Sequence, residues 1–281
     1  MILVLGATGT TGGEVARQLI AAGHKPRILV RSRAKARAFE GKAEIVEGDL
    51  GHADALAAAL AGVKKLFLVS AGLDGPKLEA SAIQQAAKAK VEHIVKLSVV
   101  TADDPHLTFA KWHAQSEKHL VESGVPWTML RPGNFMTNAL GWTDTIKSQG
   151  AFYQPTGTGK WAAIDPVDIG AVAVKALTSP GFAGKAFTLT GPESLDGAGY
   201  AAILSKVTGK KIAFVDVPPE AARDGMLKAG LPALYVDALL DLLAVMKAGY
   251  TDMVADGVQQ ALGRKPGSFE DWARRHVAAF T

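Results

Sequence analysis

Three glycines, each three residues apart, follow the first apolar run of the chain, Ile2 to Leu5. Gly6, Gly9 and Gly12 stand between this run and an amphipathic helical pattern. Glycines in this arrangement permit a tight turn, a close approach of backbone to phosphate, and close packing of strand against helix. Because the start of a helix also attracts negative charge, the turn predicts a pyrophosphate site, with an ordinary tight turn as the alternative. The residues expected to line it are Gly6, Thr8, Gly9, Thr10, Thr11 and Gly12.

A basic cluster follows the second predicted strand, in the sequence VRSRAK. Arg31 occupies the position where a site for NADH usually has an acidic residue that binds the ribose, and Arg33 and Lys35 come close behind. A guanidinium binds a phosphate through two parallel hydrogen bonds. Arg31 and Arg33 therefore predict NADPH or NADP in preference to NADH, although Arg33 and Lys35 could also be solvated surface charges.

Asp49 and Leu50 follow the third predicted strand, in the sequence EGDL, where they could contact an adenine ring. Asp is also a favoured N-cap residue, so Asp49 could instead begin the next helix. Both interpretations stay open.

Apolar runs of strand length alternate with helical patterns through the first half of the chain. The predicted strands are Ile2 to Leu5, Arg27 to Val30, Ala43 to Val46, Lys65 to Val69, His93 to Val100 and WTMLRP. The predicted helices are Thr11 to Ala22, Ala34 to Phe39, Ala53 to Leu60, Lys77 to Lys90 and Phe109 to Glu122. Nearly continuous apolar strands in this alternation indicate an α/β fold, a Rossmann-type doubly wound parallel sheet covered on both faces.

The alternation breaks after Pro132, where an aromatic-rich segment begins. We expect residues 1–132 to form a dinucleotide-binding core. Residues 133–281 are expected to form mostly a smaller substrate-binding region, with some elements that return to the core sheet. The apolar helix Pro232 to Lys247 could be core or a subunit contact, so a monomer or a homodimer is expected.

Composition excludes several functions. The 281 residues contain no cysteine, which rules out thiol nucleophiles and thiolate metal sites, and we expect no metal. A net charge of +4, spread along the chain except near Arg31, does not indicate a nucleic-acid partner. Because no apolar stretch approaches the ~18 residues of a membrane span, we expect a cytoplasmic protein without a membrane partner.

Several segments, in order, resemble the NmrA-like branch of the atypical short-chain dehydrogenase/reductases. They are MILVLGATGTTGGEV, LVRSRAKA, VEGDL, HIVKLSVV, ESGVPWTMLRPGNFMTN and DPVDIGAVAVKAL. The resemblance covers residues 1 to about 190 and continues weakly through GRKPGSFEDWARRH. It implies that Val69, Ser70 and Ala71 line the nicotinamide ribose and that Pro132, Gly133, Asn134 and Phe135 lie beside the nicotinamide.

The chain departs from the wider superfamily at its acid/base pair. The positions of the usual Tyr and Lys hold Phe109 and His113, so the phenol that protonates an alkoxide is missing. The resemblance then implies acceptors that are already electron-poor. His113 is the best remaining proton donor, with Glu117 one turn away to orient it; alternatively, it is a pocket-wall or ribose-binding residue without a proton role.

Other side chains are candidates for substrate contacts. Ser98 could bond a substrate oxygen, or be a strand-end hydroxyl without function. The expected aromatic pocket over the nicotinamide could equally be hydrophobic core; its residues are Met136, Trp142, Phe152 and Trp161.

The leading hypothesis is an NADPH-dependent oxidoreductase that transfers hydride to a small quinone-like, azo or other conjugated aromatic acceptor. The main alternative is an NADP(H)-sensing regulatory protein without turnover. A nucleotide-sugar epimerase or dehydratase suits the fold but requires the missing tyrosine.

Overall fold

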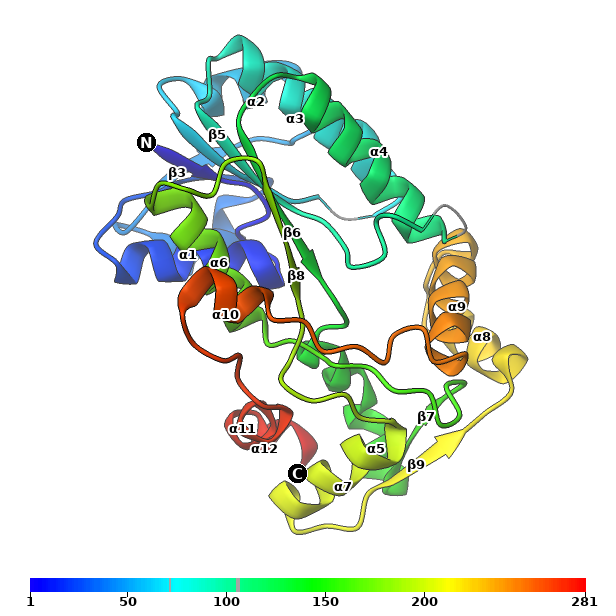
Figure 1. Ribbon diagram of the computed structural model, residues 1–281. Helices are drawn as coiled ribbons and strands as arrows, with labels where there is room; N and C mark the ends of the chain where they lie inside the picture. Colours follow the sequence, from blue (N-terminus) through cyan, green and yellow to red (C-terminus); the bar gives the residue numbers. More distant parts are fainter. Residues whose placement is uncertain (71, 105–106) are drawn as a thin grey trace. The chain divides into compact units, whose positions relative to one another are not determined.

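The computed structural model describes residues 1–70, 72–104 and 107–281 (Figure 1). The chain divides into two compact units. The first unit contains Met1–Pro132, Pro166–Thr188 and Gln260–Gly263, and the second contains Gly133–Asp165, Leu189–Gln259 and Arg264–Thr281.

The first unit is built on a seven-stranded parallel sheet, which confirms the predicted fold class. Its strand order is β3-β2-β1-β4-β5-β6-β8. Neighbours of β1 run in register with it, since Val4 pairs with Ile28 on one side and with Phe67 on the other. The strand bounds are β1 Ile2–Val4, β2 Arg27–Val30, β3 Glu44–Glu47, β4 Lys65–Leu68, β5 His93–Leu97, β6 Trp127–Pro132 and β8 Lys185–Leu189.

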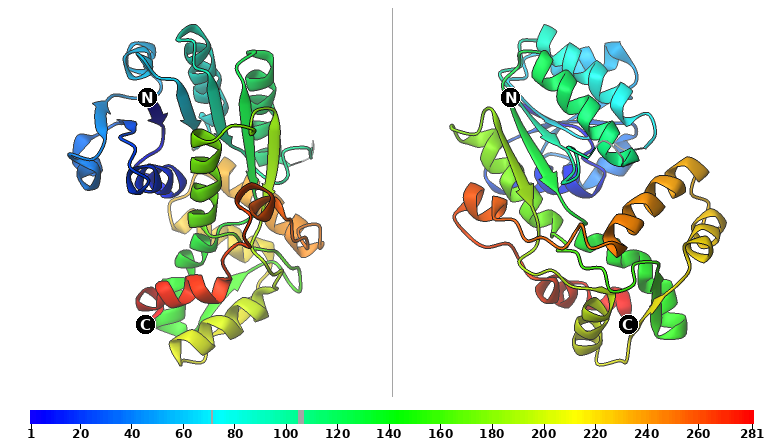
Figure 2. Two further views of the ribbon diagram at one scale, coloured as in Figure 1. Left: turned by 60° about the vertical axis from the view of Figure 1, so that its left-hand side comes forward. Right: turned by 45° about the vertical axis from the view of Figure 1, so that its right-hand side comes forward.

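Helices cover both faces of this sheet. Helices α2, α3 and α4 pack side by side on one face, whereas α1 and α6 pack together on the other (Figures 1 and 2). The bounds are α1 Thr10–Ala21, η1 Arg33–Phe39, α2 Ala53–Leu60, α3 Gly75–Lys88, α4 Thr108–Glu122 and α6 Pro166–Thr178. The chain order switches direction between β1 and β4, and in open α/β sheets ligands bind outside the carboxyl ends of the strands at such a point.

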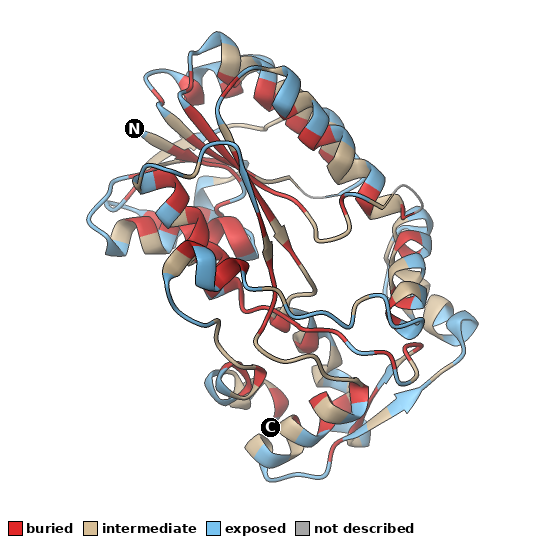
Figure 3. Ribbon diagram, in the orientation of Figure 1, coloured by how far each residue is buried: buried red, intermediate tan, exposed pale blue. Residues whose placement is uncertain are grey.

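The strands of the first unit are apolar because both faces of the sheet are covered. Leu3, Leu66 and Ile94 are fully buried, and the sheet interior is coloured as buried in Figure 3. Lys96, near the carboxyl end of β5, departs from this pattern because it is a charged side chain that is fully buried.

The second unit has its own core. Strands β7 (Ala151–Gln154) and β9 (Ala213–Asp216) pair in parallel, and Tyr200, Phe269 and Trp272 are buried together. Its helices are η2 Met136–Trp142, α5 Thr143–Gln149, α7 Gly197–Thr208, α8 Pro219–Lys228, α9 Ala233–Lys247, α11 Phe269–Arg275 and α12 Val277–Phe280, while α10 Gly257–Leu262 includes residues of both units. The predicted helix at Pro232 is α9, which buries Leu243 and Met246 in this core.

Among the helices formed by the described residues, none has the length and apolar character required to span a bilayer. The described His, Asp and Glu side chains likewise form no group of three that could hold a metal ion.

Candidate cofactor and catalytic site

The glycine turn connects β1 to α1. Gly6 has a φ of +65°, and a Cβ at this position would lie 2.7 Å from Val69 Cγ1. A Cβ on Gly12 would lie 2.4 Å from the carbonyl oxygen of Gly6, so only glycine allows α1 to approach the strand this closely. The turn closes with a hydrogen bond of 2.9 Å from the Gly9 N–H to the same carbonyl.

The outer side of this turn is accessible. Thr8, Gly9 and Thr10 are exposed, whereas Thr11 and Gly12 are buried beneath them. Gly9 is the N-cap of α1 and has no side chain that could accept from the first N–H groups of the helix. The turn therefore fits the backbone cradle that a pyrophosphate requires.

Arg31 and Arg33 lie at the carboxyl end of β2, the strand next to β1. Arg31 directly follows the strand, Arg33 begins η1, and both side chains are exposed. Within the described part of the chain, no hydrogen bond or ion pair holds either guanidinium. Both are free to bind an anion beside the glycine turn.

Asp49 does not cap a helix. The N-cap of α2 is His52, three residues later, and Asp49 Oδ1 instead accepts the Gly51 N–H at 2.8 Å. The helix-cap alternative is therefore wrong, because the carboxylate closes the turn that precedes the helix. Leu50 is half-buried against the core of the first unit. A contact of Asp49 and Leu50 with adenine stays a prediction.

The residues expected around the nicotinamide are divided between the two units. Val69 and Ser70 follow β4 and Pro132 ends β6 in the first unit, and Ala71 lies outside the described residues. In the second unit, the carbonyl of Asn134 accepts the Ile164 N–H at 2.8 Å and Phe135 forms a β-bridge with Ile164.

A buried charged cluster lies at the carboxyl ends of β4 and β5. Lys96 Nζ is 2.9 Å from Glu79 Oε2 of α3, donates to the carbonyl of Leu97 at 2.9 Å, and lies 3.4 Å from His113 Nδ1 of α4. Glu79 Oε1 accepts the N–H of Ser70 at 3.2 Å. We call Glu79, Lys96 and His113 the lysine cluster.

The sequence interpretation missed Glu79 and Lys96. The available signal was a lysine between apolar residues in the strand segment HIVKLSVV. A charged side chain in a strand that is buried on both faces requires an ion-pair or hydrogen-bond partner. Such a buried pair indicates a structured polar site.

His113 is neutral at neutral pH. Burial of the ring, followed by the nearby Lys96 ammonium, lowers its pKa to about 4, although Glu79 and Glu117 act in the opposite direction. The ring can therefore offer an N–H hydrogen bond, but it does not carry the additional proton of an imidazolium.

Glu117, expected to orient His113, is bound elsewhere. Its carboxylate accepts from Ser98 Oγ at 2.5 Å and from Arg131 Nε and Nη2 at 3.0 and 2.6 Å. Arg131 also donates to Asp103 at 2.8 Å. Burial favours protonation of Glu117, but the hydrogen bonds from Arg131 and Ser98 outweigh it and lower the pKa. The buried Ser98 hydroxyl thus joins β5 to α4 and has its proton committed to Glu117.

The predicted pocket residues lie in the hydrophobic core of the second unit. Met136, Phe152 and Trp161 are at most 3% exposed. Trp142 stacks on Phe152 with ring centres 4.0 Å apart, and Trp161 stacks on Tyr200 at 4.7 Å. These contacts support the core interpretation of this set.

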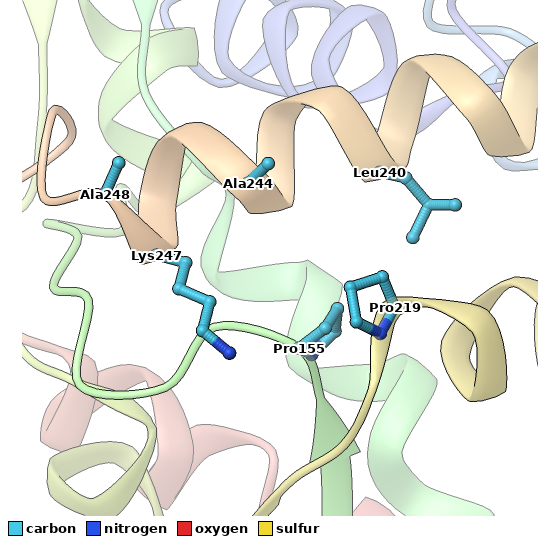
Figure 4. Close-up of a pocket in the computed structure, with 6 residues that line it drawn as sticks. All are labelled: Pro155, Pro219, Leu240, Ala244, Lys247 and Ala248. Atoms are coloured by element: carbon cyan, nitrogen blue, oxygen red, sulfur yellow. The ribbon is translucent and has the colours of Figure 1, made fainter.

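A pocket of about 260 Å³ lies elsewhere in the second unit (Figure 4). It is largely apolar, and its one charged side chain, Lys247, pairs with Asp216 at 3.1 Å. None of the predicted pocket residues lines it; the lining residues are Pro155, Pro219, Leu240, Ala244, Lys247 and Ala248.

The sheet order, the glycine turn and the exposed arginines define a Rossmann-type dinucleotide-binding protein. Residues 6–180 match the family described as NAD(P)H-binding. The chain is 39% identical over its whole length to an NAD(P)H azoreductase of Xenophilus azovorans, of which it covers 99%. It is 37% identical, again over its whole length, to a (4-alkanoyl-5-oxo-2,5-dihydrofuran-3-yl)methyl phosphate reductase of Streptomyces griseus, of which it also covers 99%.

Among solved structures, the fold matches an NADPH-dependent quinone oxidoreductase of Escherichia coli in complex with NADPH. The TM-score is 0.89 with 28% identity, covering 99% of this chain and all of the other. The chain therefore belongs to the NAD(P)H-binding family, and the resemblance to the NmrA-like short-chain dehydrogenase/reductases is confirmed. It is an NAD(P)H-dependent oxidoreductase.

Proposed function

We propose that the protein is an NADPH-dependent reductase of quinone-like, azo or other conjugated aromatic acceptors. This proposal rests on the residues found at the two positions that usually hold the acid/base pair. Phe109 cannot ionise and packs edge-to-face against Trp112 at 5.3 Å, and His113 is neutral at pH 7. Such a site suits acceptors that take hydride before they are protonated, because their conjugated systems delocalise the added charge.

The relatives of the chain point the same way. An azoreductase and a quinone oxidoreductase are among them, and azo compounds and quinones both accept hydride into a conjugated system. The sensing alternative needs no acceptor, and no observation on this chain favours it over the reductase.

Each part of the site has a proposed role. NADPH supplies the hydride from C4 of its nicotinamide when it is bound. The glycine turn binds the pyrophosphate, Arg31 and Arg33 bind the 2′-phosphate, and Asp49 and Leu50 contact the adenine. Val69, Ser70, Ala71, Pro132, Asn134 and Phe135 are proposed to surround the nicotinamide and its ribose, and His113 donates a hydrogen bond to the acceptor.

The two predicted regions of the chain are proposed to have different roles. Residues 1–132 would hold the cofactor, and residues 133–281 would supply most of the acceptor-binding region while α6 and β8 complete the sheet.

The reductase proposal is tested by the loss of NADPH absorbance with quinones, azo dyes and triphenylmethane dyes. We expect multiple turnovers, slowed by about 5- to 100-fold in His113→Ala, the effect of losing one hydrogen bond to a developing charge. Tight NADPH binding without turnover on any acceptor of the panel would contradict the proposal and favour the sensor.

The cofactor preference is tested separately with Arg31→Ser and Arg33→Ser. A charged hydrogen bond to phosphate contributes about 1.5–3 kcal/mol, so KM for NADPH should rise by about 10- to 100-fold while KM for NADH changes little. Arg37→Ser is the matched control, since Arg37 is also an exposed arginine of η1. Equal losses with both cofactors would refute the assignment.

A further inference from the structure

The ammonium of Lys96 has three N–H donors and three polar groups around it. Its partners are Glu79 Oε2 and the Leu97 carbonyl, both at 2.9 Å, and His113 Nδ1 at 3.4 Å. The side chain is fully buried. An ammonium cannot accept a hydrogen bond, so every group in contact with it must present a lone pair.

We infer that Lys96 is a positioning residue that holds His113 as the neutral tautomer protonated on Nε2. A proton on Nδ1 would point at the N–H donors of Lys96, whereas a lone pair on Nδ1 accepts from them. The neutral ring has one N–H, which must then be on Nε2. The hydrogen-bond donor of this histidine is thus defined by a lysine on a neighbouring strand.

Lys96 forms a buried ion pair with Glu79. The Glu79 carboxylate is itself buried, and its other oxygen accepts the Ser70 N–H at 3.2 Å and lies within hydrogen-bond distance of the Ser70 hydroxyl, at 3.1 Å. A buried ammonium next to a buried carboxylate at 2.9 Å is stabilised as an ion pair, whereas two neutral groups would lose the charge-assisted hydrogen bonds.

The carboxylates near the ring do not convert His113 to the imidazolium, because each is paired with a cation. From α3, Glu79 favours the imidazolium, but its charge is balanced by Lys96 of β5. From α4 itself, Glu117 also favours the imidazolium, but Arg131 of β6 pairs with it and also binds Asp103.

The lysine cluster also joins this histidine to the proposed cofactor site. Glu79 binds the backbone and hydroxyl of Ser70, a residue proposed to line the nicotinamide ribose. The cluster therefore fixes the ring relative to the carboxyl end of β4. This last step rests on the proposed function, whereas the assignment of the tautomer does not.

The tautomer is measured directly on the full chain labelled with ¹⁵N-histidine. A long-range ¹H–¹⁵N spectrum identifies which ring nitrogen carries the proton, and loss of one signal set in His113→Gln assigns it among the seven histidines. We expect a single Nε2–H form that persists from pH 8 to about pH 5.5. A proton on Nδ1, or an imidazolium at neutral pH, would overturn the inference.

The role of Lys96 is tested by removing both members of the ion pair. Lys96→Met alone leaves a buried carboxylate without its cation, which destabilises strongly, so the informative variant is Glu79→Gln/Lys96→Met. Lys65→Met is the matched control, because Lys65 also donates to a backbone carbonyl, that of Leu177 at 2.6 Å, but from the amino end of β4.

In the double variant we expect a mixture of the two neutral tautomers, and a kcat at least about 5-fold lower with KM for NADPH unchanged. The control should keep the single tautomer. An unchanged single tautomer in the double variant would refute the role of Lys96 even in an active enzyme. The expected spectra without turnover in the wild type would support the inference and refute only the proposed reductase.

Discussion

Replacement of His113 should change how the stability of the protein depends on pH. The pKa of this histidine is about 4 in the folded protein, mainly through burial and the Lys96 ammonium, against an ordinary value of 6.5. Between these two values the unfolded chain binds a proton that the folded protein does not. The free energy of unfolding therefore falls as the pH drops from 6.5 to 4, and it levels off below that range.

The size of this effect follows from the difference between the two pKa values. A difference of about 2.5 corresponds to roughly 3 kcal/mol at 1.36 kcal/mol for each pKa unit. This is an upper limit, because the ring is only half-buried and solvent screens part of the interaction. A loss of this size is a large part of the stability of an average domain.

The assay is urea unfolding at pH 4.5, 5.5, 6.5 and 7.5 for the wild type and His113→Gln. The wild type should lose up to about 2.5 kcal/mol more than the variant across this range, because pH 4.5 still lies above the pKa of the folded protein. His93, whose pKa is lowered mainly by burial, and Glu117 also cause acid destabilisation, but they are present in both proteins and cancel in the difference. His52→Gln is the control for replacing an exposed histidine.

If the free energies of unfolding of the wild type and His113→Gln change in parallel with pH, this reasoning is refuted. A constant difference would mean that the ring has the same proton affinity in the folded and unfolded states. The lysine cluster would then exert no net effect on its charge.

Two further substitutions test the turn and the second unit. Gly12→Ala places a Cβ 2.4 Å from a backbone carbonyl, so it should destabilise by about 1–3 kcal/mol in urea and weaken NADPH binding in a titration by at least about 10-fold. Gly225→Ala is the control, because its added Cβ would lie in open space, and it should change neither the stability nor NADPH binding. Phe152→Ala removes a fully buried ring and should cost about 3–5 kcal/mol in the same unfolding assay without altering the KM for the acceptor; a changed KM with normal stability would restore the pocket interpretation.

The fold could be predicted because a parallel sheet produces a strong local pattern. The run Arg27 to Val30 is apolar after its first residue and is β2 with the predicted bounds. The prediction for β5 was too long, since the strand ends at Leu97 and not at Val100. Ser98 and Val100 still donate backbone hydrogen bonds to Leu130 and Pro132, which explains why their sequence resembles the strand before them.

The charged part of the site could not be predicted from local spacing. The interval between His113 and Glu117 suggests a helical pair, but such pairs contribute only about 0.2–0.5 kcal/mol. The bidentate hydrogen bond from Arg131 to the buried carboxylate of Glu117 is stronger, and it determines the orientation of the Glu117 side chain. Glu79 and Lys96 lie on different elements, so only the packing of α3 against the sheet reveals the pair.

The charge distribution around His113 leads to a prediction about catalysis. The two buried carboxylates that act on His113 are paired with cations, Glu79 with Lys96 and Glu117 with Arg131, so neither is left to stabilise an imidazolium. A neutral Nε2–H can stabilise negative charge that develops on the acceptor, while solvent supplies the proton later. We therefore expect kcat to be nearly constant between about pH 5.5 and pH 8, because a histidine with a pKa of about 4 does not titrate there. A pH profile of kcat with an inflection near 6.5 that disappears in His113→Gln would show instead that the ring itself transfers the proton.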